Sequence, residues 1–433
     1  MTGPLLDLLA GRVGRADVVV KTDDTLSLAI SPDGDTRVSA SRARNTHLRV
    51  ARDGRIGYAS TTSEIPEELA EQALNAASSG VQLELYLPMP APIPEVAVRE
   101  PQAAVADVAV LDGLARALLE RLRRSNRRVE VWAELSTGSV LVGNTRGVLT
   151  GYEVTLAGAG TVVESIGAGY APPCRLHVAG TSLPTLSELE AIVTDIDRRL
   201  DPPILRPSRP LSPTAPVCLA PRAVAGFLTP VRAALTGHEA WLGNSPLRGR
   251  LGERVFDQKF SLPDDPLVNG RPGSRPVDDD GVVSRRVPLV ERGWLVGFLA
   301  DLEVGSRAGV PSTGHAWRRP HGGSRVGFTN LRVAPGVETP ATLLTMMGRG
   351  ILIDDLEWDS GPNPIRGTLN LRVPWAYLVE NGSVTGRLEG IRLSGSVFNA
   401  LTRIVAVGGD PTWVGSAWVP SLLLEGLTVL QTG

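Results

Sequence analysis

Lysine is almost missing from this sequence of 433 residues, in which only Lys21 and Lys259 stand among 44 basic side chains. A phosphate-binding P-loop needs a lysine between a glycine and a serine or threonine, and neither lysine has those neighbours. A Schiff-base enzyme would depend on one of these two residues, which argues against pyridoxal chemistry. The scarcity of lysine therefore removes two common classes of cofactor enzyme.

Cysteine is equally scarce, because Cys174 and Cys218 are the only two. They are too few for a disulfide scaffold or a zinc ribbon, and we expect buried thiols in a reducing compartment. No apolar run reaches the roughly 18 residues of a membrane span, and Asp7 without a preceding basic region argues against a signal peptide. We therefore expect a cytoplasmic protein that does not contact a membrane.

Neither sign of charge is in excess, since 44 basic and 46 acidic residues give a formal net charge of −2. Proteins that bind nucleic acid usually carry a basic excess or a basic stripe, so we expect no direct contact with nucleic acid. Aromatic residues make up 4% of the chain and hydrophobic residues 42%. A sizeable core is therefore available, built mainly from Val, Leu, Ala and Ile.

The first half mixes extended and helical patterns. Residues 17–60 alternate in the manner of strands, with a hairpin turn at Asp53-Gly54. Apolar stripes at helical spacing predict three long helices. The remaining predicted elements are a short helix over 4–12, helices from Pro66 to just before Gly80, over 109–124 and over 185–199, and strands over 129–135, 139–144, 151–157 and 161–166.

Five prolines between Asp201 and Pro213 indicate a domain boundary. Beyond it we expect a strand over 215–219 and a helix over 221–235 that Pro230 interrupts. Further strands are expected near 282–300, 325–333, 367–380 and 383–394, and helices near 339–348 and 397–404. The sequence thus predicts an α+β protein: residues 1–210 form a mixed sheet with flanking helices, and residues 211–433 form a mostly-β domain.

The pair His238-Glu239 is the first candidate for metal chemistry. A zincin helix needs a second histidine four residues later, and that position is Leu242. The pair stands in a glycine-flanked stretch, so we expect a surface loop there.

A loop over Ser312–Gly323 combines imidazole and guanidinium groups with flexible backbone. This composition suits the binding of a carboxylate or a peptide. The alternative is a solvated loop whose glycines only turn the chain. The residues predicted to bind substrate are Thr313, Gly314, His315, Arg318 and His321.

Two acidic clusters, Asp264-Asp265 and Asp278-Asp279-Asp280, have the oxygen ligands that a hard cation prefers. They lack the spacing of an EF-hand, and adjacent carboxylates point apart on an extended chain. Turn and capping roles are therefore the favoured interpretation.

The second half resembles the TldD/PmbA family, whose members are often labelled modulators of DNA gyrase. The resemblance depends on many short segments in a shared order and is strongest over about 220–430. The segments are Ser245-Pro246-Leu247, Gly249–Phe256, Leu262–Pro266, Asp279–Val282, Glu291–Leu295, Ser312–Ala316, Val379–Gly382, Ile391–Gly395 and Ile404–Asp410.

The resemblance implies a heterodimeric metallopeptidase in which one type of subunit binds zinc through a His-Glu-x-x-x-His helix and a later cysteine. Counted without gaps, that motif falls on 228–233, where this chain has Leu228, Thr229 and Ala233, and the cysteine falls near Val414. No histidine lies between His177 and His238. The chain therefore resembles the PmbA-type subunit, with no metal ligand or catalytic residue of its own and with zinc expected in the partner.

The leading hypothesis is a non-catalytic subunit that pairs with a TldD-like zinc-bearing chain and helps to enclose short or unfolded peptides, or peptide-like substrates. A second hypothesis is a stand-alone metal-dependent hydrolase that uses His315, His321 and Asp278–Asp280. A third is a homodimeric binding or scaffold protein without peptidase activity.

Overall fold

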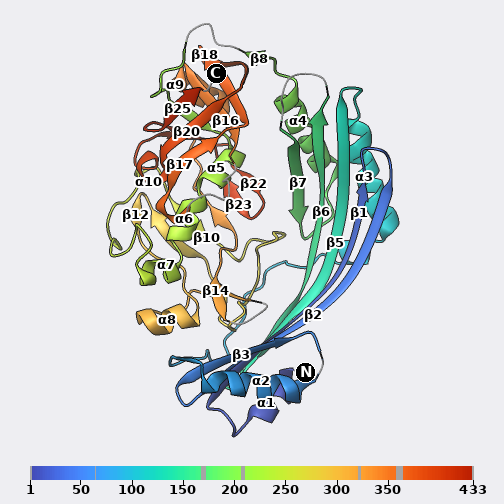
Figure 1. Cartoon of the computed structure of the whole chain (residues 1–433), viewed down its shortest axis with the longest axis vertical. Helices are drawn as coiled ribbons and strands as arrows, with labels where there is room; N and C mark the ends of the chain where they lie inside the picture. The colour runs from blue at the N-terminus through green and yellow to red at the C-terminus, as the bar shows by residue number, and fades with distance from the viewer. Residues whose placement is uncertain are drawn as a thin grey trace.

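The structure, a computed structural model, describes residues 2–63, 65–166, 172–205, 210–319, 323–356 and 364–431. Long curved strands of an N-terminal sheet run beside a β-rich C-terminal part (Figure 1). The α+β class with sheets in both halves is as the sequence predicts, whereas the division at residue 210 stays a prediction.

The N-terminal sheet has seven strands in the order β4-β3-β2-β1-β5-β6-β7, all paired antiparallel. The expected turn at Asp53-Gly54 joins β2 to β3, and both of its residues have positive φ. The strands are β1 (Arg15–Ile30), β2 (Thr36–Arg52), β3 (Arg55–Thr61), β4 (Val81–Gln82), β5 (Arg127–Asn144), β6 (Leu149–Ser165) and β7 (Cys174–Gly180).

The strands β5 and β6 are continuous, although two pairs of shorter strands were expected there. The polar stretch Ser136–Ser139 has the composition of a turn, but it pairs with β1 on one side and with β6 on the other. Because both neighbours satisfy its backbone groups, the chain continues as a strand through this stretch.

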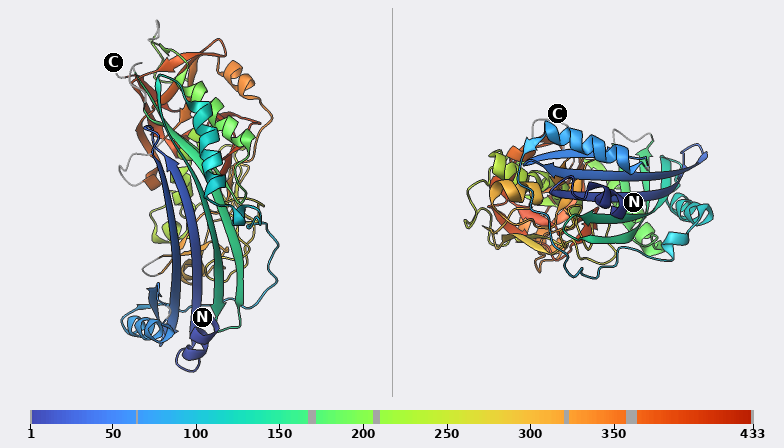
Figure 2. Two further views of the ribbon diagram at one scale, coloured as in Figure 1. Left: turned by 90° about the vertical axis from the view of Figure 1, so that its right-hand side faces the viewer. Right: turned by 90° about the horizontal axis from the view of Figure 1, so that it is seen from below.

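Helices cover the sheet at two places. The helices α1 (Thr2–Leu9) and α2 (Pro66–Ser78) pack on the ends of β1 and β2. The helices α3 (Val108–Leu122) and α4 (Leu186–Leu200) pack on β5, β6 and β7 through the predicted apolar stripes, and Figure 2 shows α3 along the sheet. This core also includes Trp375 and Tyr377 from the second half, so the two halves are in apolar contact here.

The C-terminal part holds a seven-stranded sheet, a six-stranded sheet, a three-stranded sheet and a hairpin among the described residues. All three of these sheets contribute to one large core. The seven-stranded sheet has the order β21-β24-β9-β16-β18-β19-β8, with β8 (Ile204–Leu205), β9 (Val217–Leu219), β16 (Gly350–Asp355), β18 (Trp375–Glu380), β19 (Ser383–Leu388), β21 (Ile404–Val407) and β24 (Leu422–Leu424).

The other C-terminal elements are shorter than expected, and the region 282–300 is mostly irregular. The six-stranded sheet contains β10 (Leu262–Asp264), β11 (Val287–Glu291), β12 (Trp294–Leu295), β15 (Leu331–Arg332), β22 (Thr412–Val414) and β23 (Ala417–Val419). The three-stranded sheet contains β17 (Thr368–Arg372), β20 (Ile391–Ser396) and β25 (Thr428–Gln431), and the hairpin contains β13 (Ala316–Arg318) and β14 (Ser324–Val326). The helices are α5 (Pro221–Phe227), α6 (Thr229–Ala234), α7 (Gly237–Leu242), α8 (Leu302–Ala308), α9 (Pro340–Met347) and α10 (Val397–Ala400). None of the helices in the described part of the chain has the length and apolar character needed to cross a bilayer.

Four buried charges, which we call the ion cluster, join the halves: Asp17 and Arg49 from the N-terminal sheet, and Asp280 and Arg318 from the second half. Arg49 Nη2 lies 2.7 Å from Asp17 Oδ2 and 3.0 Å from Asp280 Oδ1. Arg318 pairs with both aspartates, at 2.9 Å from Asp280 Oδ1. Burial by itself raises the pKa of Asp280, but the guanidinium groups of Arg49 and Arg318 outweigh burial and hold that pKa below its usual value. Because the four side chains are buried, their charges compensate one another.

Replacing Arg49 with methionine is expected to lower the free energy of unfolding by about 3–5 kcal/mol, because Asp17 and Asp280 would lose a buried partner. Chemical denaturation measures the loss. The matched control is Arg42→Met, which removes an exposed arginine paired with Asp24 and should leave stability nearly unchanged. Equal stability of the two variants would contradict a structural role for the ion cluster.

Candidate functional site

A broken helix follows β9 and forms the floor of the candidate site. The sequence predicts one helix over 221–235 with an interruption at Pro230, and the structure has α5 and α6 meeting at Leu228. Proline lacks the amide hydrogen that would continue the hydrogen-bond ladder, so the helix resets within one turn. The chain then turns directly into α7.

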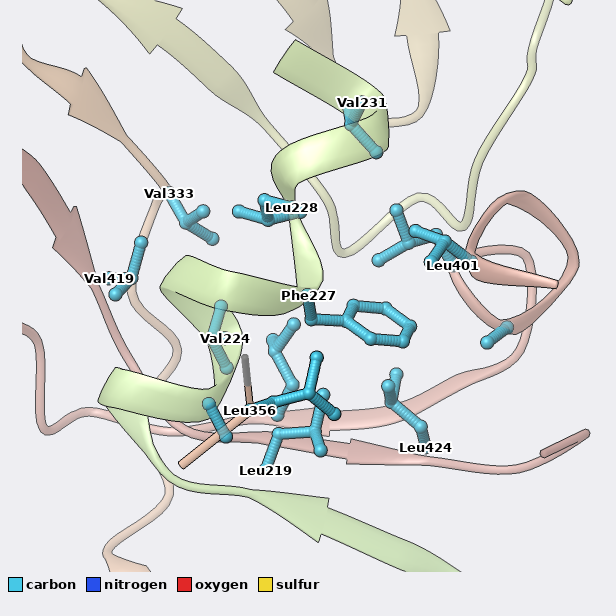
Figure 3. Close-up of a cluster of buried hydrophobic side chains, with 14 of the residues drawn as sticks. Leu219, Val224, Phe227, Leu228, Val231, Val333, Leu356, Leu401, Val419 and Leu424 are labelled. Carbon is cyan, nitrogen blue, oxygen red and sulfur yellow. The ribbon is translucent and has the colours of Figure 1, made fainter. Parts of the chain in front are cut away.

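The inner face of α5 and α6 packs into the main core. Phe227, Leu228 and Val231 have no exposed surface. Figure 3 shows these side chains lying among Leu356, Leu401, Val419 and other aliphatic groups. Burial of side chains of this size stabilises the fold by roughly 1.5–3 kcal/mol each. This face therefore serves packing.

The outer face of α6 and α7 borders two cavities of about 390 Å³ each. The cavities share Thr236, Arg325 and Val326 and therefore lie next to each other, and together we call them the α6 groove. Its lining at the α6 end is Thr229, Arg232, Ala233, Trp317, Gly327 and Phe328. Its lining at the α7 end is His238, Glu239, Trp241, Asp301, Glu303, Val304, Arg307, Arg319, Gly323 and Ser324.

The α6 groove presents guanidinium groups beside aromatic surfaces. The Arg232 guanidinium lies 5.4 Å from the centroid of the Phe328 ring, and burial lowers the pKa of Arg232. The exposed Arg319 and Arg325 add cationic groups at the rim. Guanidinium groups donate planar pairs of hydrogen bonds to carboxylates and carbonyl oxygens. The groove therefore has the donors that suit a peptide.

Glu303 connects the α6 groove to the ion cluster. Its Oε1 accepts hydrogen bonds from the Tyr58 hydroxyl at 2.5 Å and from the Ser324 amide at 3.3 Å, and it lies 3.3 Å from Arg49 Nη1. Ser324 Oγ also donates to Asp280 Oδ1 at 3.0 Å. These contacts fix β14, one wall of the groove, against the N-terminal sheet.

The loop predicted to bind substrate is placed next to the groove, but its named side chains are engaged within the protein. His315 has no exposed surface: its Nε2 lies 3.0 Å from Asp264 Oδ2, and its Nδ1 lies 2.9 Å from the Thr313 carbonyl. Thr313 Oγ1 donates to the Ala300 carbonyl, and Arg318 belongs to the ion cluster. Gly314 has a positive φ of 81°, which favours glycine.

The substrate contacts of Thr313, Gly314, His315 and Arg318 stay a prediction. Their neighbours Trp317, Arg319 and Gly323 line the groove. His321, the fifth predicted residue, lies outside the described residues.

The pair His238-Glu239 is on the helix α7, and the expectation of a loop there was wrong. Thr236 precedes the helix and Gly243 ends it with a left-handed conformation, so flanking glycine and threonine delimit one short helix instead of a loop. Both side chains line the α6 groove, and sequence analysis missed this role because helix α7 has only six residues.

In the acidic cluster Asp278–Asp280, Asp278 has the turn and capping role that the sequence favours, whereas Asp279 and Asp280 form ion pairs that were not predicted. Asp278 accepts hydrogen bonds from the amides of Asp280, Val282 and Ala316. Asp279 pairs with Lys21 at 2.5 Å. Asp280 belongs to the ion cluster. Each carboxylate is thus satisfied by protein donors.

The positions that the resemblance assigns to zinc do not fit a metal. Leu228 is part of the core, while Thr229 and Ala233 face the α6 groove without an imidazole or carboxylate. Val414 lines a different cavity. Zinc sites in proteins use thiolate, imidazole and carboxylate ligands. Among the described side chains, no group of three His, Cys, Asp or Glu residues could hold a metal ion.

Comparison with known proteins identifies the family. The family model described as "PmbA/TldA metallopeptidase C-terminal domain" matches residues 212–431, and "PmbA/TldA metallopeptidase domain 1" matches residues 16–77. The chain belongs to the PmbA/TldD family. Membership explains why the short segments of the second half occur in a fixed order.

Individual relatives of this PmbA/TldD protein are distant. A "Metalloprotease" of Methanothermobacter thermautotrophicus is 24% identical over 94% of this chain and 91% of its own length. The "Metalloprotease PmbA homolog" of Haemophilus influenzae is 28% identical over 52% of this chain, and the match spans about half, 48%, of that relative. The crystal structure of TldE from Thermococcus kodakarensis superposes with a TM-score of 0.87 at 23% identity, covering 99% of both chains, and thus shares the fold.

Replacing His315 with phenylalanine should separate a structural role from a direct role in binding. The ring volume is kept, but buried Asp264 loses a hydrogen-bond partner, so we expect the free energy of unfolding to fall by about 1–3 kcal/mol in urea denaturation. The control, His238→Phe, changes an exposed histidine of the groove and should leave stability close to wild type. Unchanged stability of the His315 variant would contradict the structural role.

Proposed function

We propose that this chain is the non-catalytic subunit of a heterodimeric TldD-like zinc metallopeptidase. The observation that carries the proposal is the composition of α6. Where the zinc-bearing type of subunit has its ligands and base, this chain has Leu228 directly before the helix and Thr229 and Ala233 within it. None of these side chains can bind zinc or accept a proton from water at neutral pH.

The role of the chain in this proposal is to bind and orient the substrate. The relatives named metalloprotease support peptides as the class of substrate. The guanidinium groups of Arg232 and Arg325 can donate to peptide carbonyl oxygens, and Trp317 and Phe328 offer apolar contact. A positioned substrate reacts faster because its orientation is fixed before the chemical step. The zinc-bearing partner supplies the activated water.

The rigid wall of the groove also supports a positioning role. Glu303 and Ser324 tie β14 to the ion cluster, and the distances in these contacts are 3.0–3.3 Å. A groove fixed in this way can hold an extended peptide whatever its sequence, which fits short or unfolded peptides as substrates. Peptide-like biosynthetic intermediates belong to the same class of substrate.

The stand-alone hydrolase is the weaker candidate, because Asp278, Asp279 and Asp280 are engaged by amides, Lys21 and arginines. The third hypothesis is a homodimeric scaffold. The co-expression experiment described next separates it from the proposal, because a scaffold would not change the peptidase rate.

Peptidase activity should depend on both subunits. We expect a zinc-bearing TldD-like chain to cleave an unstructured reporter peptide at least tenfold faster when it is co-expressed and co-purified with this chain. The reason is that the α6 groove completes the substrate site. Fluorescence of a quenched peptide measures the rate, and equal rates with and without this chain would contradict the proposal.

A matched pair of arginine variants sharpens this test. Arg325→Glu reverses an exposed charge in the groove, whereas Arg286→Glu reverses an exposed charge on a loop outside it. The first variant should raise KM with little change in kcat, because it removes binding and leaves the zinc chemistry intact. The second should leave both constants unchanged.

A further inference from the structure

The two ends of the α6 groove differ in charge. The cavity at the α6 end has a volume of about 390 Å³, and its described lining contains Arg232 and Arg325 but no carboxylate. The cavity at the α7 end is lined by Glu239, Asp301 and Glu303 as well as by arginines. Carboxylates repel an anion, so an anionic group of a ligand is favoured at the α6 end.

Arg232 brings a half-buried cation to the α6 end. In the described part of the chain its guanidinium makes no hydrogen bond and no ion pair, and it lies 5.4 Å from the centroid of the Phe328 ring. Burial lowers the pKa of Arg232, but a guanidinium stays charged at neutral pH. A partly buried cation without a direct partner is stabilised by an anion that approaches it.

One carboxylate, that of Asp264, acts on Arg232 from inside the protein. It raises the pKa of Arg232, although no ion pair joins the two among the described residues. Asp264 has no exposed surface, and its Oδ2 lies 3.0 Å from His315 Nε2 and accepts hydrogen bonds from the amide and the hydroxyl of Thr329. Asp264 therefore compensates Arg232 only in part and cannot enter the groove.

Arg325 adds a second guanidinium to the same cavity. Its side chain is exposed on β14 and has neither a hydrogen bond nor an ion pair with any described residue. The neighbouring Ser324 holds β14 in place through Glu303 and Asp280. Two guanidinium groups in one cavity match a carboxylate, to which each can donate paired hydrogen bonds.

The remaining surface of the cavity is largely apolar. Trp317, Val326 and Phe328 line it together with Ala233. Sites for small ligands combine an apolar lining with a few polar groups that fix the orientation of the ligand. A carboxylate attached to an apolar segment of peptide fits both parts of this lining.

We propose that the α6 end of the groove binds a carboxylate of the substrate peptide, with Arg232 and Arg325 donating to it. We call this place the carboxylate site. It deepens the proposed function and rests on that function for the peptide as its ligand. The carboxylate can be the C-terminus of the peptide or the side chain of an aspartate or glutamate. Both sources present the same chemistry to the arginines, so the experiment has one arm for each.

Isothermal titration calorimetry on the full chain compares peptides that differ in their carboxylate. The probes are acetyl-Ala-Ala-Leu with a free C-terminus, acetyl-Ala-Glu-Leu amide, and the uncharged acetyl-Ala-Ala-Leu amide. At least one carboxylate peptide should bind, and the uncharged amide should bind at least about tenfold more weakly, since a charge-assisted hydrogen bond is lost. The peptide that binds identifies the source of the carboxylate. Absence of binding by both carboxylate peptides, or equal binding of the uncharged amide, would overturn the proposal.

Three variants locate the site. Arg232→Gln and Arg325→Gln should each weaken binding of the carboxylate peptide at least about tenfold and bring it close to that of the uncharged amide. The matched control is Arg307→Gln, an exposed arginine at the α7 end, which should bind like wild type. If Arg232→Gln fails to fold, the exposed Arg325 decides. Wild-type affinity in Arg325→Gln, or an equal loss in Arg307→Gln, would overturn the proposal.

Failure of the carboxylate site can be told apart from failure of the proposed function. Binding of a carboxylate peptide by this chain, together with an unchanged peptidase rate on co-expression, would reject the proposed function and leave the carboxylate site standing. A raised peptidase rate without any preference for carboxylate peptides would support the proposed function and overturn the carboxylate site.

Discussion

The ion cluster of Asp17, Arg49, Asp280 and Arg318 is the constraint on which the arrangement of the two halves depends. Each half contributes one acid and one base, so neither half satisfies its charges fully without the other. Burial of an unpaired charge costs several kcal/mol, which penalises any arrangement that separates the halves. The apolar contact through Trp375 and Tyr377 is another connection between the halves, at a different place on the same sheet. Together the ion cluster and this contact fix the N-terminal sheet against the C-terminal part.

This arrangement has a consequence for the α6 groove. Glu303 and Ser324 contact both the ion cluster and the groove, so the groove wall is held by residues from both halves. A change in the N-terminal sheet can therefore alter the groove although no residue of β1 or β2 lines it. The family fold supplies this frame, and the chemistry depends on which side chains α6 carries. In this chain α6 carries apolar side chains, the Thr229 hydroxyl and the Arg232 guanidinium, and none of these is a usual zinc ligand.

The sequence predicts local structure well where a short-range signal exists. The turn at Asp53-Gly54 follows from residues that tolerate positive φ. The helices α3 and α4 follow from their apolar stripes. The continuity of β5 could not be predicted, because it depends on pairing with β1, more than a hundred residues earlier.

The residues of the candidate site come from distant parts of the sequence. The site was therefore harder to predict than the local structure. The loop beside the groove was found from its composition, but the partners of His315 and Arg318 lie 51 and 301 residues away, at Asp264 and Asp17. One signal was present in the sequence: Asp17 directly precedes three buried valines, and a charged residue in such a strand implies a buried partner.

The absence of zinc chemistry from α6 is the central claim, and the metal content of the separated subunits tests it most directly. The chain is purified from its own host together with any partner, and native mass spectrometry with elemental analysis assigns the metal to a subunit. The account predicts a complex with a second, different chain that retains the zinc, while this chain alone binds none tightly even after incubation with zinc. A transition metal held at one equivalent by this chain alone would contradict the account.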